Sequence, residues 1–401
     1  MLILVLNAGS SSLKYQLIDM NTEQPLAVGV VGRISLENST LTHSVRGEQY
    51  VIHQPVSNHT EAVQLVLNTL QDKTMGVIKS MDEIGAVGHR VLHGGTEFSE
   101  SVIINDEVKA AIRKCIPLGP LHNPANLAGI EACEKVIPCT PQVAVFDTAF
   151  HQTMPAKAYL YGVPKKYHDE LGVRRYGFHG TSYRWVNKRA CEFMGIPQEG
   201  TKVIICHLGN GSSLSACVDG KCVDTSMGLT PLEGLLMGTR CGSCDPAVVQ
   251  FIANSQNMTI DQVLDMMNRE SGLLGISGIS SDMRDVDAAA DAGVENAILA
   301  RDMLVYGIQK YIGAYTAAMG GVDMIIFTGG IGENNAKLRE RVMKNFGYLG
   351  VKLDADKNAA CADGKAYECI ISTDDSKVKI LVIPTNEELM IARDTMQLVS
   401  E

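Results

Sequence analysis

The sequence predicts an α/β protein built from two similar halves. The main indication is a repeated pattern, an apolar strand ending in a turn rich in Gly and small polar residues, at residues 2–19, 202–220 and 323–335. In the first two copies a second strand follows at once, at residues 13–18 and 213–218, so each copy is a hairpin. Such turns let backbone N–H groups approach an anion, because Gly has no Cβ and Ser adds a hydroxyl donor. We therefore expect a duplicated fold that holds a polyphosphate between its halves.

The other elements alternate strands with helices, which is typical of an α/β architecture. Asn123 and Pro124 predict a helix that runs to about residue 136, with Asn123 as its N-cap. An apolar stripe with i, i+3/i+4 spacing predicts one long core helix over residues 294–319. Further strands are expected near residues 26–33, 84–88, 142–146, 323–328 and 379–383, and further helices near 59–72, 182–194, 245–255, 259–269 and 335–345 and from Asn386 onward.

The composition is that of a globular chain of two or three domains, with 401 residues of which 45% are hydrophobic and 20% charged. No apolar run approaches the roughly 18–20 residues of a membrane helix. Residues 1–12 lack the basic segment of a signal peptide, so we expect a cytoplasmic protein without membrane contacts. The formal net charge of −10 argues against nucleic acid as a partner. It also means that an anionic substrate needs a local cluster of cations.

The eleven cysteines are scattered and mostly lie in apolar segments. An odd count with irregular spacing favours reduced thiols used as small core residues over a disulfide framework. Cys241 and Cys244 form a lone C-x-x-C, whereas a zinc site needs about four ligands. This pair is therefore either a metal or redox site or two small residues in a loop.

Two arginines stand beside apolar sequence. Arg90 follows a predicted buried strand, and Arg240 ends a largely apolar stretch in which Gly234 and Gly238 leave room to bend toward a ligand. A buried guanidinium without a partner is costly, so each arginine faces either an anion or a structural carboxylate.

Two carboxylates and two histidines also stand at element ends. Asp147 follows the strand at 142–146, where ligands of open α/β sheets bind, and Glu387 opens the last helix. Asp147 is a candidate for binding Mg²⁺ or orienting a nucleophile, and a turn cap explains it equally well. Glu387 is a candidate for Mg²⁺ through water, although helix-dipole stabilisation is the more ordinary explanation. His122 precedes a helix N-terminus, which favours an anion, and His179 lies between a strand-like stretch and a helix. Structural roles are expected for His89, His93, His151 and His168.

An ordered series of motifs covers nearly the whole chain: NAGSSSLKY, GHRVLHGG, HNPAN, FDTAFH, RYGFHGTS, HLGNGSSL, GLTPLEGLLMGTR, FTGGIGEN and PTNEELMIARDT. This series resembles the acetate kinase family. The resemblance implies a duplicated ribonuclease-H-like (actin-like ATPase) fold with two domains around a central cleft. It also implies a homodimer that transfers phosphoryl reversibly from ATP to acetate with Mg²⁺ (or Mn²⁺), giving acetyl phosphate and ADP. The implied domains are an acyl/phosphate domain, residues 1–149 plus 385–401, and a nucleotide-binding and dimerisation domain, residues 150–384.

The resemblance further implies roles for residues at matching positions. The catalytic residues would be Arg90, Asp147, His179, Arg240 and His122. The acetate pocket would be lined by Arg90, Leu92, Leu121, Phe178 and Pro231, with Leu92 bulkier than the Val usual in the family. Phosphate and nucleotide contacts would come from Ser10, Ser12, Lys14, His207, Leu208, Gly209, Asn210, Gly211, Asp282, Met283, Arg284, Gly330, Ile331, Gly332 and Asn334, and the metal shell from Asn7 and Glu387. Acetate is already a nucleophile, so the reaction needs charge neutralisation and in-line positioning rather than a strong base.

Three alternatives stay open. A propionate or butyrate kinase differs only in the acyl pocket, and the bulk of Leu92 favours acetate, although one methylene is worth only about 1–3 kcal/mol. A non-metabolic actin-like ATPase would have no use for Arg90, Arg240 and His179. A pyrophosphate-linked kinase would differ in the phosphoryl donor.

Overall fold

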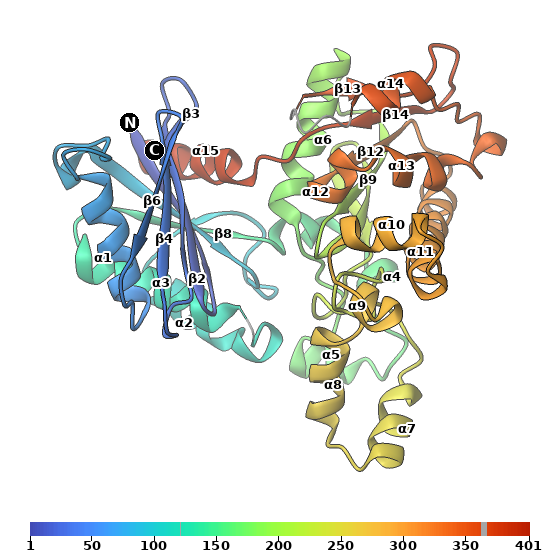
Figure 1. Cartoon of the computed structure of the whole chain (residues 1–401), viewed down its shortest axis with the longest axis horizontal. Helices are drawn as coiled ribbons and strands as arrows, with labels where there is room; N and C mark the ends of the chain where they lie inside the picture. Colours follow the sequence, from blue (N-terminus) through green and yellow to red (C-terminus); the bar gives the residue numbers. More distant parts are fainter. Residues whose placement is uncertain (121, 362–366) are drawn as a thin grey trace. The chain divides into compact units, whose positions relative to one another are not determined.

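A computed structural model of the chain describes residues 1–120, 122–361 and 367–401. The chain divides into two compact units, Met1–Phe150 with Asn386–Glu401, and His151–Thr385. Each unit contains its own β-sheet with helices packed on it, which confirms the predicted α/β class (Figure 1). The described residues include no helix with both the length and the apolar character needed to cross a bilayer.

The first unit is built on an eight-stranded sheet. Its strands are β1 (Leu2–Gly9), β2 (Ser12–Asp19), β3 (Gln24–Gly32), β4 (Thr40–Val45), β5 (Glu48–His53), β6 (Ile84–Val91), β7 (Val102–Ile103) and β8 (Gln142–Phe146), and its helices are α1 (His59–Leu70), α2 (Asp106–Lys114), α3 (Asn123–Val136) and α15 (Glu387–Ser400), with short 3₁₀ turns η1 (Met81–Glu83) and η2 (Ile116–Leu118). The strand order is β5-β4-β3-β2-β1-β6-β8-β7. Antiparallel pairing joins β1, β2 and β3, and parallel pairing joins β1, β6 and β8.

Different helices cover the two faces of this first sheet. Alternate residues of a strand point to opposite faces. Val87 of β6 lies in the apolar core that α1 and α3 complete. A Cβ on the next residue, Gly88, would lie 2.6 Å from Ile391 of α15. The C-terminal helix therefore returns to the first unit and covers the face opposite α1 and α3, and Gly88 permits its close approach.

The second unit is built on a six-stranded sheet. Its strands are β9 (Lys202–Leu208), β10 (Ser212–Val218), β11 (Lys221–Thr225), β12 (Met324–Thr328), β13 (Cys369–Ile370) and β14 (Lys379–Val382). Its helices are α4 (Ala156–Tyr159), α5 (Lys166–Leu171), α6 (Gly180–Met194), α7 (Ala247–Gln256), α8 (Ile260–Arg269), α9 (Gly272–Ser277), α10 (Met283–Asp291), α11 (Glu295–Met319), α12 (Gly329–Asn334), α13 (Ala336–Met343) and α14 (Ala355–Ala360), with 3₁₀ turn η4 (Gly347–Leu349); the turn η3 (Ala149–Thr153) spans the sequence junction of the units.

The second sheet repeats the connectivity of the first. Its order is β11-β10-β9-β12-β14-β13, with β9, β10 and β11 antiparallel and β9, β12 and β14 parallel. In both units an antiparallel meander, of five strands in the first unit and three in the second, thus precedes two strands parallel to its first member. This repeat is the duplication that the two Gly/Ser hairpins predicted.

Most predicted elements are confirmed, including the long helix, which is α11. The predicted start of α3 is wrong, because His122 is the N-cap and Asn123 is the first helical residue. The Asn123 side chain instead accepts from the backbone N of His93 at 3.1 Å and donates to its carbonyl at 3.0 Å. Asn123 therefore fixes the loop after β6 rather than the end of its own helix.

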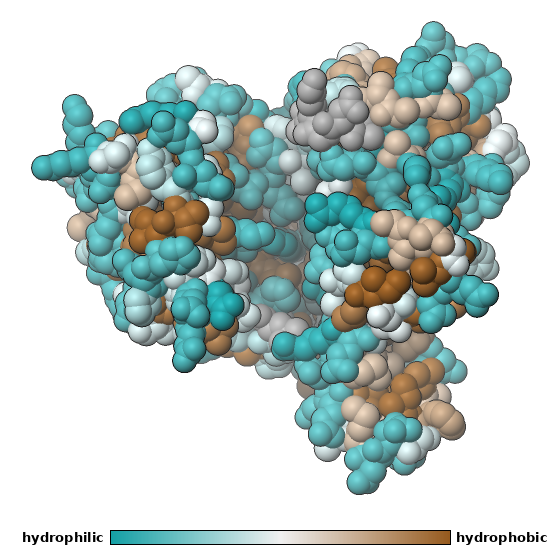
Figure 2. All heavy atoms as spheres, in the orientation of Figure 1, coloured by the Kyte–Doolittle hydropathy of each residue, from teal (hydrophilic) through white to brown (hydrophobic). Residues whose placement is uncertain are grey.

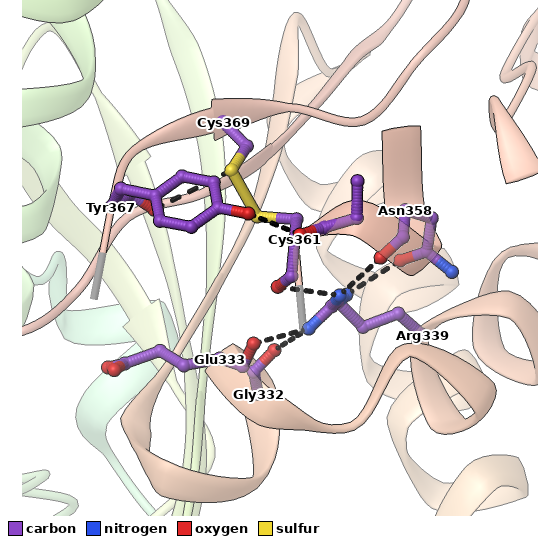
Figure 3. The surroundings of a disulfide bond; sticks show 8 residues. Gly332, Glu333, Arg339, Asn358, Cys361, Tyr367 and Cys369 are labelled. Carbon is purple, nitrogen blue, oxygen red and sulfur yellow. Dashed lines mark hydrogen bonds between the residues drawn. A yellow bond between two sulfur atoms is a disulfide. The ribbon is translucent and has the colours of Figure 1, made fainter. Parts of the chain in front are cut away.

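One cysteine pair departs from the expected pattern of reduced thiols. Cys361, at the end of α14, and Cys369, in β13, form a disulfide with their Cα atoms 6.5 Å apart (Figure 3). A backbone bond from Asp354 N to Ile371 O holds the start of α14 against this strand, a non-local contact that cysteine spacing does not reveal. The other nine cysteines are free, Cys241 and Cys244 among them.

The buried His89 predicts a dependence of stability on pH. Its Nε2 lies 2.6 Å from Oε1 of Gln142, and burial lowers its pKa to about 4, against the bond to Gln142. In the unfolded chain a histidine titrates near 6.5. The stability contributed by neutral His89 is therefore complete above pH 6.5 and is lost as the pH falls toward 4, by on the order of 3 kcal/mol. Urea unfolding between pH 7 and 4 should show a steeper loss for the wild type than for His89→Gln, and parallel profiles would contradict this assignment.

Candidate active site

Arg90 and Asp147 lie at the carboxyl ends of neighbouring parallel strands. Val91 of β6 pairs with Phe146 of β8, so Asp147 follows directly beside the end of β6. Nε and Nη2 of Arg90 donate to Oδ1 and Oδ2 of Asp147 at 3.0 and 2.7 Å. Asp147 is fully buried, whereas 24% of the Arg90 side chain is exposed. The sequence left open whether Arg90 faces an anion or a structural carboxylate. The structure pairs it with the carboxylate of Asp147, and this bidentate pair fixes the plane of the guanidinium.

Glu387, the first residue of α15, lies beside the same arginine. Its Oε2 is 3.7 Å from Nε of Arg90. Burial raises the pKa of Glu387 to about 7, although the Arg90 cation acts to lower it. A second cation would favour the charged form of this carboxylate.

Two residues of the first unit carry oxygen atoms of the kind that Mg²⁺ binds in proteins. The described residues contain no group of three or more His, Cys, Asp or Glu side chains suited to a metal. Mg²⁺ needs no such cage, because it keeps several waters and takes one or two carboxylates. Glu387 would supply a carboxylate, and Asn7 would supply an amide oxygen. Asn7 pairs in register with Lys14, and both line a cavity of about 290 Å³ together with Glu388.

A side chain of α3 links the turn between β1 and β2 to the loop that follows Arg90. Asn126 of α3 donates from Nδ2 to the carbonyl of Ala8 at 2.8 Å, and its Oδ1 accepts from the backbone N of Leu92 at 3.0 Å. Leu92 is buried. Ser10 and Lys14 are exposed beside this turn, Ser12 is half-buried in β2, and His122 is half-buried before α3. Asn126 lies in the HNPAN motif, but nothing in its spacing indicated this link. Leu121 lies outside the described residues.

In the second unit, the first turn of α6 is bonded to the β9–β10 hairpin. Nδ1 of His179 lies 2.8 Å from Oγ of Ser213, and Nδ1 of His207 lies 2.8 Å from Oγ of Ser182. The two imidazole rings stack, with centroids 4.1 Å apart and planes 18° apart. His179 caps α6 with φ of 60°, which turns the chain sharply before the helix. Phe178, just before it, is buried.

His179 and Arg240 approach one point at the tip of this hairpin. A Cβ built on Gly211 would lie 3.5 Å from Nη1 of Arg240 and 3.7 Å from Nε2 of His179. Nη1 of Arg240 also donates to the carbonyl of Pro231 at 3.3 Å. No carboxylate within the described part of His151–Thr385 forms an ion pair with Arg240, and burial lowers its pKa. Arg240 is therefore a partly buried cation suited to an anionic ligand.

A cavity of about 700 Å³ lies between α10 and α12. The residues that line it are Gly209, Asn210, Ser281, Asp282, Met283, Arg284, Asp287, Gly330, Ile331, Asn334 and Asn335. Most of the predicted nucleotide contacts are among them, and Ser281, Asp287 and Asn335 were missed. Leu208 and Gly332 are instead buried in the adjacent core. A volume of this size lies within the usual range for small-molecule sites.

Both walls of the cavity between α10 and α12 are held by side-chain hydrogen bonds. Asp282 caps α10 by accepting from Arg284 N at 2.9 Å, and an ion pair with the Arg284 side chain lowers the pKa of Asp282 to about 2. On the other wall, Glu333 accepts from Gly329 N at 2.8 Å and from Thr385 N at 3.1 Å. Gly329 has φ of 77°, which favours glycine at this turn.

The buried side chain of Arg339 forms hydrogen bonds with the C-terminal end of α12. Nη1 of Arg339 donates to the carbonyls of Gly332 and Glu333 at 2.8 and 2.7 Å, and Nε donates to Oδ1 of Asn358 at 2.8 Å (Figure 3). Nη2 donates to the carbonyl of Cys361, so the disulfide borders the same network. The C-terminal carbonyls of α12 thus have buried partners.

These observations define a class of protein, a duplicated α/β fold of the ATPase type with a Gly/Ser hairpin turn in each unit. The family model of the acetokinase family matches residues 2–393, and the chain belongs to that family. It is 55% identical over 401 residues to an acetate kinase of Clostridium novyi, covering 100% of this chain and 99% of the relative.

Solved structures give the same result for the fold. The acetate kinase of Porphyromonas gingivalis matches with a TM-score of 0.94 and 48% identity, covering 99% of both chains. A propionate kinase of Francisella tularensis matches with a TM-score of 0.92 and 40% identity, also covering 99% of both. The predicted ribonuclease-H-like, actin-like ATPase fold is therefore confirmed.

Gly211→Ala tests whether the point approached by Arg240 and His179 must stay open. The added methyl would make ordinary contacts with both side chains, so the fold should be unaffected, but it would occupy the space of an anion. We expect turnover to fall by on the order of 100-fold, as for loss of a positioned anion contact, with an unchanged melting temperature. Gly162→Ala, which adds a methyl where no atom lies within 4 Å, is the matched control. Equal turnover in the two variants would show that nothing binds there.

Proposed function

We propose that this chain is an acetate kinase, which transfers the terminal phosphoryl group of ATP reversibly to acetate and forms acetyl phosphate and ADP. The observation that carries the proposal is the approach of Arg240 and His179 to Gly211, at the tip of a hairpin whose residues Gly209 and Asn210 also line the α10–α12 cavity. A cationic point beside a nucleotide-sized cavity is the arrangement that phosphoryl transfer requires.

Each unit supplies a different part of the reaction in this proposal. In the first unit Arg90, held by Asp147, binds and orients the acetate carboxylate. In the second unit Arg240 neutralises the charge that spreads over the phosphoryl oxygens, and His179 stabilises it through a hydrogen bond. His122 assists them, and Leu92, Leu121, Phe178 and Pro231 surround the acetate methyl group. Convergence of both sets of side chains on one phosphoryl group is part of the proposal.

The proposal assigns the adenosine to the second unit and the metal to residues of the first unit. Adenosine occupies the α10–α12 cavity with Asp282, Arg284, Gly330, Ile331 and Asn334 around it. The hairpin residues contact its phosphates: Ser10, Ser12, Lys14, His207, Asn210 and Gly211. Mg²⁺ (or Mn²⁺), held by Asn7 and by Glu387 through water, would neutralise phosphate charge.

A propionate kinase is the second candidate, because a propionate kinase is among the similar structures. Acyl phosphate trapped by hydroxylamine distinguishes the candidates. With ATP and Mg²⁺, acetate should give more hydroxamate than propionate, and an assay without any acid should give none. Equal kcat/KM for the two acids would favour a broad acyl kinase. Acid-independent ATP hydrolysis would indicate an ATPase instead, and activity with pyrophosphate in place of ATP would change the donor.

The two arginines provide the sharpest mutational test. Arg90→Ala and Arg240→Ala should each lower kcat by on the order of 10³, the scale of a transition-state arginine. Arg113→Ala, which removes an exposed arginine paired with Glu131, should leave kcat unchanged. Near-normal turnover in both active-site variants would end this assignment.

We also propose a homodimer formed through the second unit. Large apolar side chains are exposed on α7 and α8, among them Phe251 at 73% and Ile260 at 63%, and hydrophobic atoms gather over this part of the surface in Figure 2. Contiguous apolar surface of this kind marks interaction sites. Light scattering should give twice the chain mass, and Phe251→Asp should lower it; a monomeric wild type would refute the proposal. A cytoplasmic location and the absence of a nucleic-acid partner stay predictions.

A further inference from the structure

A buried line of hydroxyl groups leads from the interior of the second unit to His179. The Tyr183 hydroxyl bonds Oγ of Ser213, and Oγ of Ser213 lies 2.8 Å from Nδ1 of His179. Tyr183 and Ser213 are both fully buried. His179 is the N-cap of α6 and Tyr183 lies in the first turns of that helix, and the bonds of both side chains to Ser213 show that both face β10.

The hydrogen bonds along this line have a defined donor and acceptor at each step. Burial raises the pKa of the Tyr183 hydroxyl well above its usual value, so the group keeps its proton. Among the described residues, Ser213 is the one hydrogen-bond partner of that hydroxyl. If Nδ1 of His179 carried a proton, Ser213 would accept it, and three protons would then share the two contacts of Ser213. One hydroxyl proton, of Ser213 or of Tyr183, would be buried without an acceptor among the described residues. An unsatisfied buried donor costs about 1–3 kcal/mol.

In the favoured arrangement the Tyr183 hydroxyl therefore donates to Oγ of Ser213, and the Ser213 hydroxyl donates to Nδ1 of His179. A neutral imidazole carries one N–H. When Nδ1 accepts, that N–H lies on Nε2, the atom that faces the point above Gly211.

We propose that Ser213 and Tyr183 are positioning residues that fix the orientation and tautomer of His179, so that Nε2–H points at the phosphoryl group in transfer. The inference rests on the proposed function, because it needs His179 to contact that group. It adds that the imidazole acts as a neutral hydrogen-bond donor whose proton is placed before the substrate binds. Neither residue touches the substrate itself.

Ser213→Ala removes the donor to Nδ1. We expect kcat to fall on the order of 10–100-fold, as for partners that orient a ligating or catalytic histidine, with KM for ATP and for acetate within about twofold of wild type. Tyr183→Phe leaves the Ser213 hydroxyl free to donate or to accept, so a smaller loss is expected. Ser215→Ala is the matched control, because Ser215 is equally buried on the same strand and bonds the carbonyl of Asp224 instead. It should retain full turnover.

A double-mutant cycle separates positioning from general damage to the fold. In a His179→Ala background, Ser213→Ala should cause no further loss of kcat, because its effect passes through the imidazole. A full loss in that background would overturn the proposal. The proposal would also be overturned if Ser213→Ala had wild-type kcat while His179→Ala was impaired. That result would leave the proposed function intact. Wild-type kcat in His179→Ala would instead overturn the role of His179, and the inference with it.

Nitrogen NMR of the full chain reads the tautomer directly. The wild-type His179 signals should show a protonated Nε2 and an unprotonated Nδ1, and Tyr183→Phe should shift them toward a mixture of both tautomers. A protonated Nδ1 in the wild-type neutral ring would overturn the proposal whatever the kinetics show.

Discussion

The register between β9 and β10 determines where the chemically important side chains of the second unit lie. Ser213 pairs with His207, so both side chains leave the same face of the sheet, where α6 covers them. The first turn of α6 then supplies His179 to Ser213 and Ser182 to His207. A slip of one residue in either strand would turn that strand's residue to the other face of the sheet, so Ser213 and His207 would no longer both face α6. The short Gly-Asn-Gly turn fixes this register and also leaves the space at Gly211 that His179 and Arg240 approach.

Holding an anion in a chain of formal charge −10 requires cations that are placed in advance. The two units meet this requirement differently. Arg90 is held by the buried carboxylate of Asp147, which fixes its plane but offsets part of its charge. Arg240 has a carbonyl contact and no ion pair with a described carboxylate of its unit, so its full charge remains available. The first arrangement suits orientation of a small carboxylate, and the second suits a group whose negative charge grows during the reaction.

The sequence predicted what is local and periodic. Strand ends with Gly/Ser turns and the apolar stripe of α11 were readable because backbone geometry and helix period depend on neighbouring residues. Asn126, Ser213 and Asp287 were missed because their partners lie far along the chain or on another element. Cys361 and Cys369 were missed for the same reason, since a backbone contact between Asp354 and Ile371 brings them together. The motifs did identify most of the residues that line the α10–α12 cavity, but only through likeness to a family.

Duplication explains why the two units place such different chemistry at equivalent strand ends. In the first sheet the two parallel strands that follow the meander carry Arg90 near the end of β6 and Asp147 directly after β8. In the second sheet Gly329 directly follows β12, and β14 ends shortly before Thr385. The same topology thus presents a charged pair in one copy and a glycine turn in the other. A charged pair leaves little room and favours a small anion, whereas glycine lets a larger ligand lie close to the backbone. Under the proposed function, the acetate and the adenosine are bound by different units, so that a reaction between the two ligands would need both units.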